Sequence, residues 1–164
     1  METNKTEKIL IALDYDPSAQ KVAEVGFAMA KAMNLKTVLL HVIPDPVYYN
    51  SRDYSPIMGF TGFTAEGPLP SDSAETLKKA AWLFLDKARN HLGDPTIQTL
   101  VKDGDVTGLI LETANDQNAG FIVMGSHSRK WLEKIIMGSV TQKVLLKTSV
   151  PVVQVPVDEE SENE

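Results

Sequence analysis

The 164-residue sequence contains no cysteine, which excludes a disulfide framework, a thiolate metal site and a cysteine nucleophile. It has no apolar run near the roughly 18 residues that cross a bilayer, and Met1–Glu7 lacks the apolar centre of a signal peptide. It has no basic cluster, and its formal net charge is −6, whereas nucleic-acid binding depends on Lys and Arg that neutralise phosphates. We therefore expect a soluble, cytoplasmic protein that neither inserts into a membrane nor binds nucleic acid.

Short apolar runs alternate with helical patterns along the chain. The expected strands are Lys8–Leu13, Lys36–Ile43, Thr96–Lys102, Phe121–Met124 and Val150–Val155. Four helices are expected. The first begins after Asp16-Pro17-Ser18 and ends at Met33, and the second begins at a cap on Asp72 or Ser73 and ends at Leu92. The third spans Val106–Asn115 and the fourth Ser139–Lys147. The strands are apolar on both alternating faces, which is typical of a parallel sheet covered on both sides. The order predicts a Rossmann-like α/β fold, with an open five-stranded parallel sheet of order 3-2-1-4-5 and helices on both faces.

One domain is expected over residues 1–157, followed by an acidic tail, 158–164, that we expect to be disordered. The segment 44–71 is an irregular loop with five prolines and three glycines. It also holds five of the eleven aromatic residues, whereas disordered linkers are poor in aromatics. We therefore expect this loop to pack partly against the domain or a partner.

The expected strand order predicts where a ligand binds. In open parallel sheets, ligands lie at the carboxyl ends of the strands, at the point where the strand order reverses. Here that point is between the first and the fourth strand, which end near Asp14 and Gly125. We expect these two residues to face each other across a crevice.

The segment Met124–Thr141 (MGSHSRKWLEKIIMGSVT) joins the fourth strand to the last helix. Gly125 allows a sharp turn and a close approach to a ligand. The amides at the helix start, from Ser139 to Thr141, and the helix dipole favour an anion. The same start also fits a capping box between Ser139 and Gln142, so the spacing alone leaves a phosphate site and a simple helix cap both open.

The segment resembles the nucleotide-binding signature G-x2-G-x9-G-[ST] of universal stress proteins. Here Gly125 is followed after two residues by Ser128, and after nine more by Gly138-Ser139. The resemblance extends to KILIALD in the first strand, LLHVI in the second, Gly104-Asp105, and SVPVVQVP near the end. It covers nearly the whole chain except the aromatic-rich loop and the tails. It implies an adenine nucleotide alpha hydrolase-like fold that binds ATP, or AMP or ADP, with Mg²⁺ held through the phosphates.

The resemblance also implies a set of nucleotide-binding residues. The triphosphate would lie along Gly125, Ser126, His127, Ser128, Arg129 and Lys130, and at Gly138, Ser139, Val140 and Thr141. Asp14 would contact the ribose or the adenine, Ala12 and Val42 would hold the base through their backbones, and Met124 would line the pocket. Family members usually form homodimers through the last strand, here Val150–Val155, while a higher oligomer and a regulatory protein partner stay open.

Ser128 departs from the signature, which has a second glycine at that position. If the position needs a positive φ, serine costs about 1–2 kcal/mol, and about 1.4 kcal/mol is tenfold in affinity. Alternatively, its hydroxyl donates to a phosphate. The expected function is an ATP-binding regulatory protein of the stress response, and the alternative is a dimeric interaction scaffold that binds no nucleotide. An ATP-activating enzyme is disfavoured, because the sequence has neither a phosphate loop near the first strand nor additional substrate-domain residues. No residue is obviously placed as a catalytic base, so slow ATP hydrolysis is the most that we expect.

Several other residues receive structural roles. We expect His41 to be a hydrogen-bonded core histidine, Asp16 to cap the first helix, and Trp82 and Trp131 to pack. The apolar stripe expected for the first helix consists of Val22, Val25, Met29, Ala32 and Met33. The three histidines show no metal-ligand spacing, and no metal site of protein ligands is expected.

Overall fold

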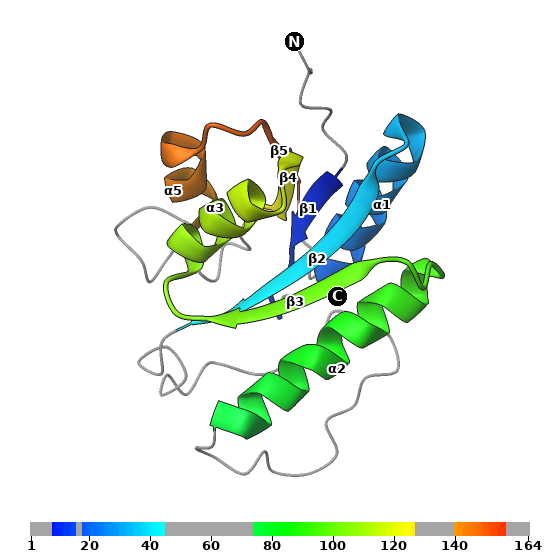
Figure 1. Ribbon diagram of the computed structural model, residues 1–164, viewed down its shortest axis with the longest axis vertical. Helices are drawn as coiled ribbons and strands as arrows, with labels where there is room; N and C mark the ends of the chain where they lie inside the picture. The colour runs from blue at the N-terminus through cyan, green and yellow to red at the C-terminus, as the bar shows by residue number, and fades with distance from the viewer. Residues whose placement is uncertain (1–7, 16–17, 45–73, 127–139, 157–164) are drawn as a thin grey trace, which may run out of the picture.

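The computed structural model describes residues 8–15, 18–44, 74–126 and 140–156. In these residues five parallel strands form one sheet of order β3-β2-β1-β4-β5, as predicted (Figure 1). The strands are β1 Lys8–Ala12, β2 Lys36–Ile43, β3 Gln98–Asp103, β4 Ala119–Gly125 and β5 Val152–Val155. The predicted loop beyond Pro44 and the acidic tail lie outside the described residues.

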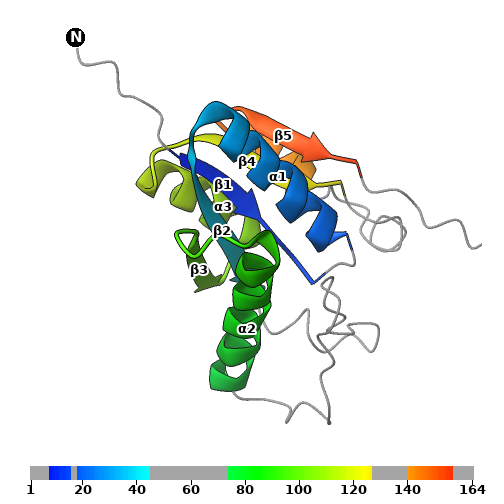
Figure 2. The same cartoon turned by 90° about the vertical axis from the view of Figure 1, so that its right-hand side faces the viewer.

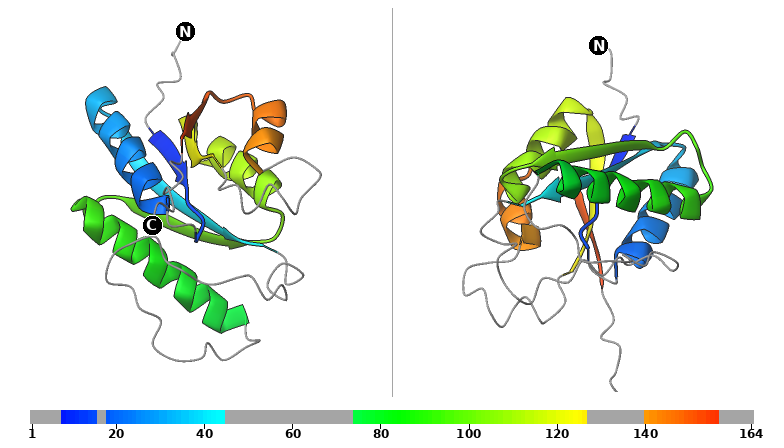
Figure 3. Two further views of the ribbon diagram at one scale, coloured as in Figure 1. Left: turned by 180° about the vertical axis from the view of Figure 1, so that it is seen from behind. Right: turned by 90° about the horizontal axis from the view of Figure 1, so that it is seen from below.

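Helices cover both faces of the sheet. They are α1 Ala19–Met33, α2 Ala74–Leu92, α3 Val106–Asp116 and α5 Val140–Lys147. The helices α1 and α2 lie on one face and α3 and α5 on the other, as the front and back views show (Figures 1 and 3). Figure 2 shows the strands from β5 at one side of the sheet to β3 at the other.

Each face of the sheet has its own apolar core, because successive side chains of a strand point to opposite faces. In β1, Ile9 and Ile11 pack toward α1 and α2, whereas Leu10 packs toward α3 and α5. All three are fully buried. The continuous apolar strands of the sequence follow directly from this arrangement.

The buried stripe of α1 differs from the predicted one. Its buried residues are Ala19, Val22, Ala23, Gly26 and Ala30, whereas Ala32 and Met33 are exposed. Small residues face the sheet because the helix packs closely on it. A Cβ added at Gly26 would lie 2.6 Å from Cδ1 of Ile11. The larger residues Val25 and Met29 lie at the margin of this contact and are partly buried.

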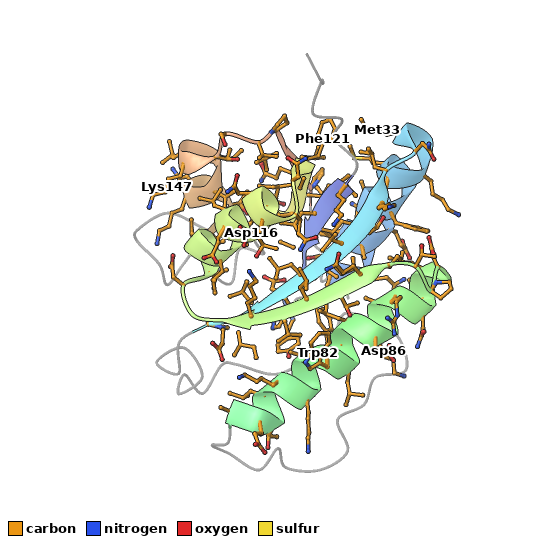
Figure 4. All side chains as sticks on the ribbon, viewed as in Figure 1. Met33, Trp82, Asp86, Asp116, Phe121 and Lys147 are labelled. Carbon is orange, nitrogen blue, oxygen red and sulfur yellow. The ribbon has the colours of Figure 1, made fainter. Side chains whose placement is uncertain are left out.

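Element boundaries mostly agree with the sequence prediction. Asn34 ends α1 in the left-handed conformation at φ 56°, and Ser18 is its N-cap residue, while Asp16 lies outside the described residues. The strand β5 begins at Val152, two residues later than predicted, because Pro151 precedes it and has no N–H to donate. The prediction for Trp82 was wrong, since the side chain is 47% exposed on α2 (Figure 4). Trp131 lies outside the described residues.

Candidate functional site

The carboxyl ends of β1 and β4 separate from each other. Their pairing stops at Ile11 and Val123. On the outer sides the pairing continues, from β1 to β2 as far as Ala12 and from β4 to β5 as far as Gly125. This difference opens a crevice at the point of strand-order reversal, where the sequence predicted it.

A pocket of about 630 Å³, a volume that includes open solvent at its mouth, occupies this crevice. Every predicted binding residue that the structure describes lines it, namely Ala12, Asp14, Val42, Met124, Gly125, Ser126, Val140 and Thr141. The other predicted residues, His127, Ser128, Arg129, Lys130, Gly138 and Ser139, lie outside the described residues.

The described walls of the pocket are mainly apolar. Leu40 and Val42 of β2 and Val106 and Ile110 of α3 form one side. Asp14 is the one ionisable side chain among the described lining residues, and it is exposed. An apolar slot with a carboxylate at its rim suits a flat neutral ring joined to a group with hydroxyl donors.

The start of α1 also lines the pocket, which the sequence did not predict. Ser18, Ala19 and Val22, from the first turns of this helix, line the pocket beside Asp14. The signal was available, because a helix that follows a parallel strand begins at the carboxyl edge of the sheet. The α3 residues Val106 and Ile110 could have been found in the same way.

The peptide group between Gly125 and Ser126 is bonded on both sides. The Ser126 N–H donates to the carbonyl oxygen of Val155 in β5 at 2.9 Å. The hydroxyl of Thr141, a buried residue in the first turn of α5, donates to the carbonyl oxygen of Gly125 at 3.0 Å. These two groups are therefore bonded to protein atoms in this structure.

Comparison with known proteins identifies the family. Residues 5–156 match the model of the Universal stress protein family. The chain belongs to this family.

Individual universal stress proteins resemble it along nearly their whole length. Universal stress protein MJ0577 of Methanocaldococcus jannaschii is 28% identical over 154 residues, which cover 91% of this chain and 94% of that protein. A solved structure of MJ0577 has a TM-score of 0.67 at 22% identity, with 93% of this chain and 97% of that chain covered.

Two further solved structures contain nucleotides. A universal stress protein in complex with cAMP has a TM-score of 0.59 at 17% identity and covers 93% of this chain and 98% of its own. The universal stress protein from Archaeoglobus fulgidus in complex with dAMP has a TM-score of 0.56 at 19% identity and covers 90% and 96%. These likenesses show that the universal stress protein fold is shared.

His41 of this universal stress protein lies beside the site but on the α2 face of the sheet. Its Nδ1–H donates to the carbonyl oxygen of Leu13 at 2.7 Å, and the residue is 2% exposed, which confirms the predicted core histidine. The rings of Tyr15 and Phe84 pack against it, with centroids 4.3 and 5.5 Å away. Burial lowers the pKa of His41 to about 4, although the Leu13 bond partly opposes this shift. The imidazole is therefore neutral at physiological pH.

No group of three or more His, Cys, Asp or Glu side chains within the described residues is arranged to hold a metal ion. Within the same residues, no helix has the length and apolar character needed to span a membrane.

Proposed function

We propose that this universal stress protein binds an adenine nucleotide, ATP in the first place, and acts as a regulatory protein of the stress response in the cytoplasm. The observation that carries the proposal is the pocket at the β1–β4 crevice. It is lined by all described residues that the family signature implicates. The related proteins with cAMP and dAMP add support, since both ligands contain adenine.

The chemistry of the walls suggests the orientation of the ligand. The adenine ring would lie between the apolar side chains of Val42, Ile110 and Met124. The Asp14 carboxylate would accept hydrogen bonds from ribose hydroxyls. Because this carboxylate would repel phosphates, the phosphate chain would extend the other way, toward Gly125 and the first turn of α5.

A magnesium ion would be bound by the phosphates themselves. Mg²⁺ commonly binds nucleotide phosphates with only one or two protein carboxylates, and it keeps several water molecules. The described part of the pocket, with the single carboxylate of Asp14, fits this mode rather than a cage of protein ligands. Bound in this way, Mg²⁺ would neutralise part of the phosphate charge.

We also propose a homodimer formed through β5, the exposed edge strand next to β4. In the described sheet, no strand pairs with the backbone N–H and C=O groups on the outer side of β5. The β5 strand of a second copy would pair with these groups. A protein partner could then recognise the dimer with nucleotide bound.

The alternative function is a dimeric scaffold that binds no nucleotide. The Ser126 N–H favours it, because this donor is used within the protein. Ser128 in the place of a glycine points the same way.

One experiment distinguishes the two functions. Freshly purified protein is denatured, and released nucleotides are identified by chromatography, while thermal unfolding is recorded with and without Mg-ATP. At a ligand concentration of 100 Kd, binding stabilises the native state by about 2.7 kcal/mol, which raises the melting temperature by several degrees. GTP at the same concentration serves as a control. A protein free of nucleotide with the same melting temperature in Mg-ATP as in buffer would exclude the proposed function.

A further inference from the structure

The orientation of the Gly125–Ser126 peptide group can be derived from its two hydrogen bonds. The described residues include no cis peptide bond, so the N–H and the C=O of this group point in opposite directions. The N–H points toward Val155 of β5. The carbonyl oxygen of Gly125 therefore points away from β5, toward the crevice side of β4, and there it meets the hydroxyl of Thr141.

This carbonyl oxygen would disfavour the binding of an anion beside it. A carbonyl oxygen carries partial negative charge, and beside a phosphate it would repel the ligand. Gly125 has no Cβ to restrict rotation of the following peptide group, so the position of this oxygen depends on its bonds. Both Gly125 and Thr141 line the pocket, and Thr141 is only 3% exposed.

We propose that Thr141 is a positioning residue for the negatively charged part of the ligand, an inference that rests on the proposed function. Its hydroxyl donates to the Gly125 carbonyl oxygen, which fills one of the two lone pairs of this oxygen and holds the first turn of α5 against the end of β4. The anion would then meet the amide donors at the helix start, and the nearby Gly125 carbonyl oxygen would already accept a hydrogen bond from Thr141. Thr141 acts through Gly125 and is not itself a phosphate donor.

Thr113 provides a matched control within the same chain. It is fully buried, and its hydroxyl donates to the Leu109 carbonyl oxygen at 2.6 Å within α3. It does not belong to the described pocket lining. Thr113→Val therefore removes the same kind of bond without changing the pocket.

The test compares a charged ligand with a neutral one. Calorimetry gives the Kd of Mg-ATP and of adenosine for the wild type, Thr141→Val, Thr141→Ser and Thr113→Val. Thr141→Val should weaken Mg-ATP binding about tenfold and change adenosine binding less than about twofold. Thr141→Ser, which keeps the hydroxyl, should restore Mg-ATP binding, and Thr113→Val should leave both constants close to those of the wild type.

Each other outcome overturns a specific claim. Unchanged Mg-ATP binding by Thr141→Val, or an equal loss for both ligands, overturns the role of Thr141 and leaves nucleotide binding intact. A wild type that binds neither ligand overturns the proposed function and this role with it. Circular dichroism checks the fold of each variant, and Thr141→Ala replaces Thr141→Val if the latter does not fold.

Discussion

His41 makes the folded state sensitive to acid. Its Nε2 atom is buried without a hydrogen-bond partner in the described structure, so a proton there would place an unpaired charge in the core. With the pKa of His41 lowered from 6.5 to about 4, the unfolded chain binds a proton in this interval that the folded chain does not bind. The free energy of unfolding therefore decreases as the pH falls from 6.5 to 4, and this contribution levels off below pH 4.

We predict that His41→Gln flattens this pH dependence. The shift corresponds to about 3 kcal/mol between the two pH limits, and glutamine can donate to Leu13 without titrating. Urea unfolding at several pH values between 7 and 4 measures the slope for each protein.

The control for His41→Gln is His91→Gln. His91 is a surface histidine whose Nε2 lies 2.6 Å from Oε1 of Glu24, and an exposed pair of this kind contributes little to stability. The interaction with His91 lowers the pKa of Glu24, and this exposed pair adds only a small loss of stability as Glu24 becomes protonated. Equal slopes for the wild type and His41→Gln would contradict the assignment.

At the scale of elements, Gly26 sets how closely α1 packs on the sheet. A methyl group at this position would meet Cδ1 of Ile11 at 2.6 Å and Cγ1 of Val123 at 3.3 Å. Ile11 is fully buried, so its side chain can move away only by displacing close-packed neighbours. The helix propensity of alanine therefore competes with overpacking of the core.

We predict that Gly26→Ala lowers the free energy of unfolding by about 1–2 kcal/mol, because overpacking outweighs the gain of about 1 kcal/mol in helix propensity. Ile11→Val removes Cδ1, the nearer of the two Ile11 atoms that would clash, while Cγ1 stays 2.8 Å from the added Cβ, so the double variant should regain only part of the stability lost in Gly26→Ala. Chemical denaturation of both single variants and the double variant gives the coupling energy. If Gly26→Ala is at least as stable as the wild type, the sheet accommodates the added methyl group without loss of stability, which would contradict the prediction.

The periodicity of apolar residues predicted that α1 is a helix but not which of its faces is buried. The pattern of large apolar residues predicted a stripe that included Met33, whereas the helix buries the neighbouring stripe of Ala23, Gly26 and Ala30. Periodicity gives the existence of a helix, but close packing decides which face is buried. In α2, by contrast, the large Phe84 faces the core together with Ala81, Leu85 and Ala88.

At the scale of the whole molecule, β5 offers one edge for assembly. Pro151 and Val155 direct their carbonyl oxygens to β4, where they accept from Ile122 and Ser126. Because backbone groups of a strand alternate in direction, the N–H groups of Val152 and Gln154 point away from the sheet. A partner strand would bind these outward groups.

We predict that Gln154→Pro converts the proposed homodimer into a monomer. Proline removes one outward N–H and is tolerated on an edge strand, so the pairing of β5 with β4 should persist. Light scattering coupled to size-exclusion chromatography measures the mass, and Gln154→Thr, which keeps the N–H, is the control. A dimeric Gln154→Pro protein with an unchanged dissociation constant would place the interface elsewhere.

The strand order and the location of the pocket could be predicted from the sequence. The alternation of elements allows few topologies, and the crevice at β1 and β4 follows from the order of the strands. The bonds of Ser126 and Thr141 could not be predicted, because they depend on where Val155 and Gly125 lie in the folded chain. The exposure of Trp82 likewise depends on the width of the α2 contact.

The bond from Ser126 to Val155 gives this molecule a built-in reporter. Deuterium replaces an amide hydrogen only when its hydrogen bond opens, so the exchange rate at Ser126 measures how often the end of β5 frays from β4. A second chain held along the other edge of β5 would suppress that fraying. Mass spectrometry or NMR of hydrogen–deuterium exchange at this single amide would then follow assembly from the rim of the pocket, without a covalently attached probe.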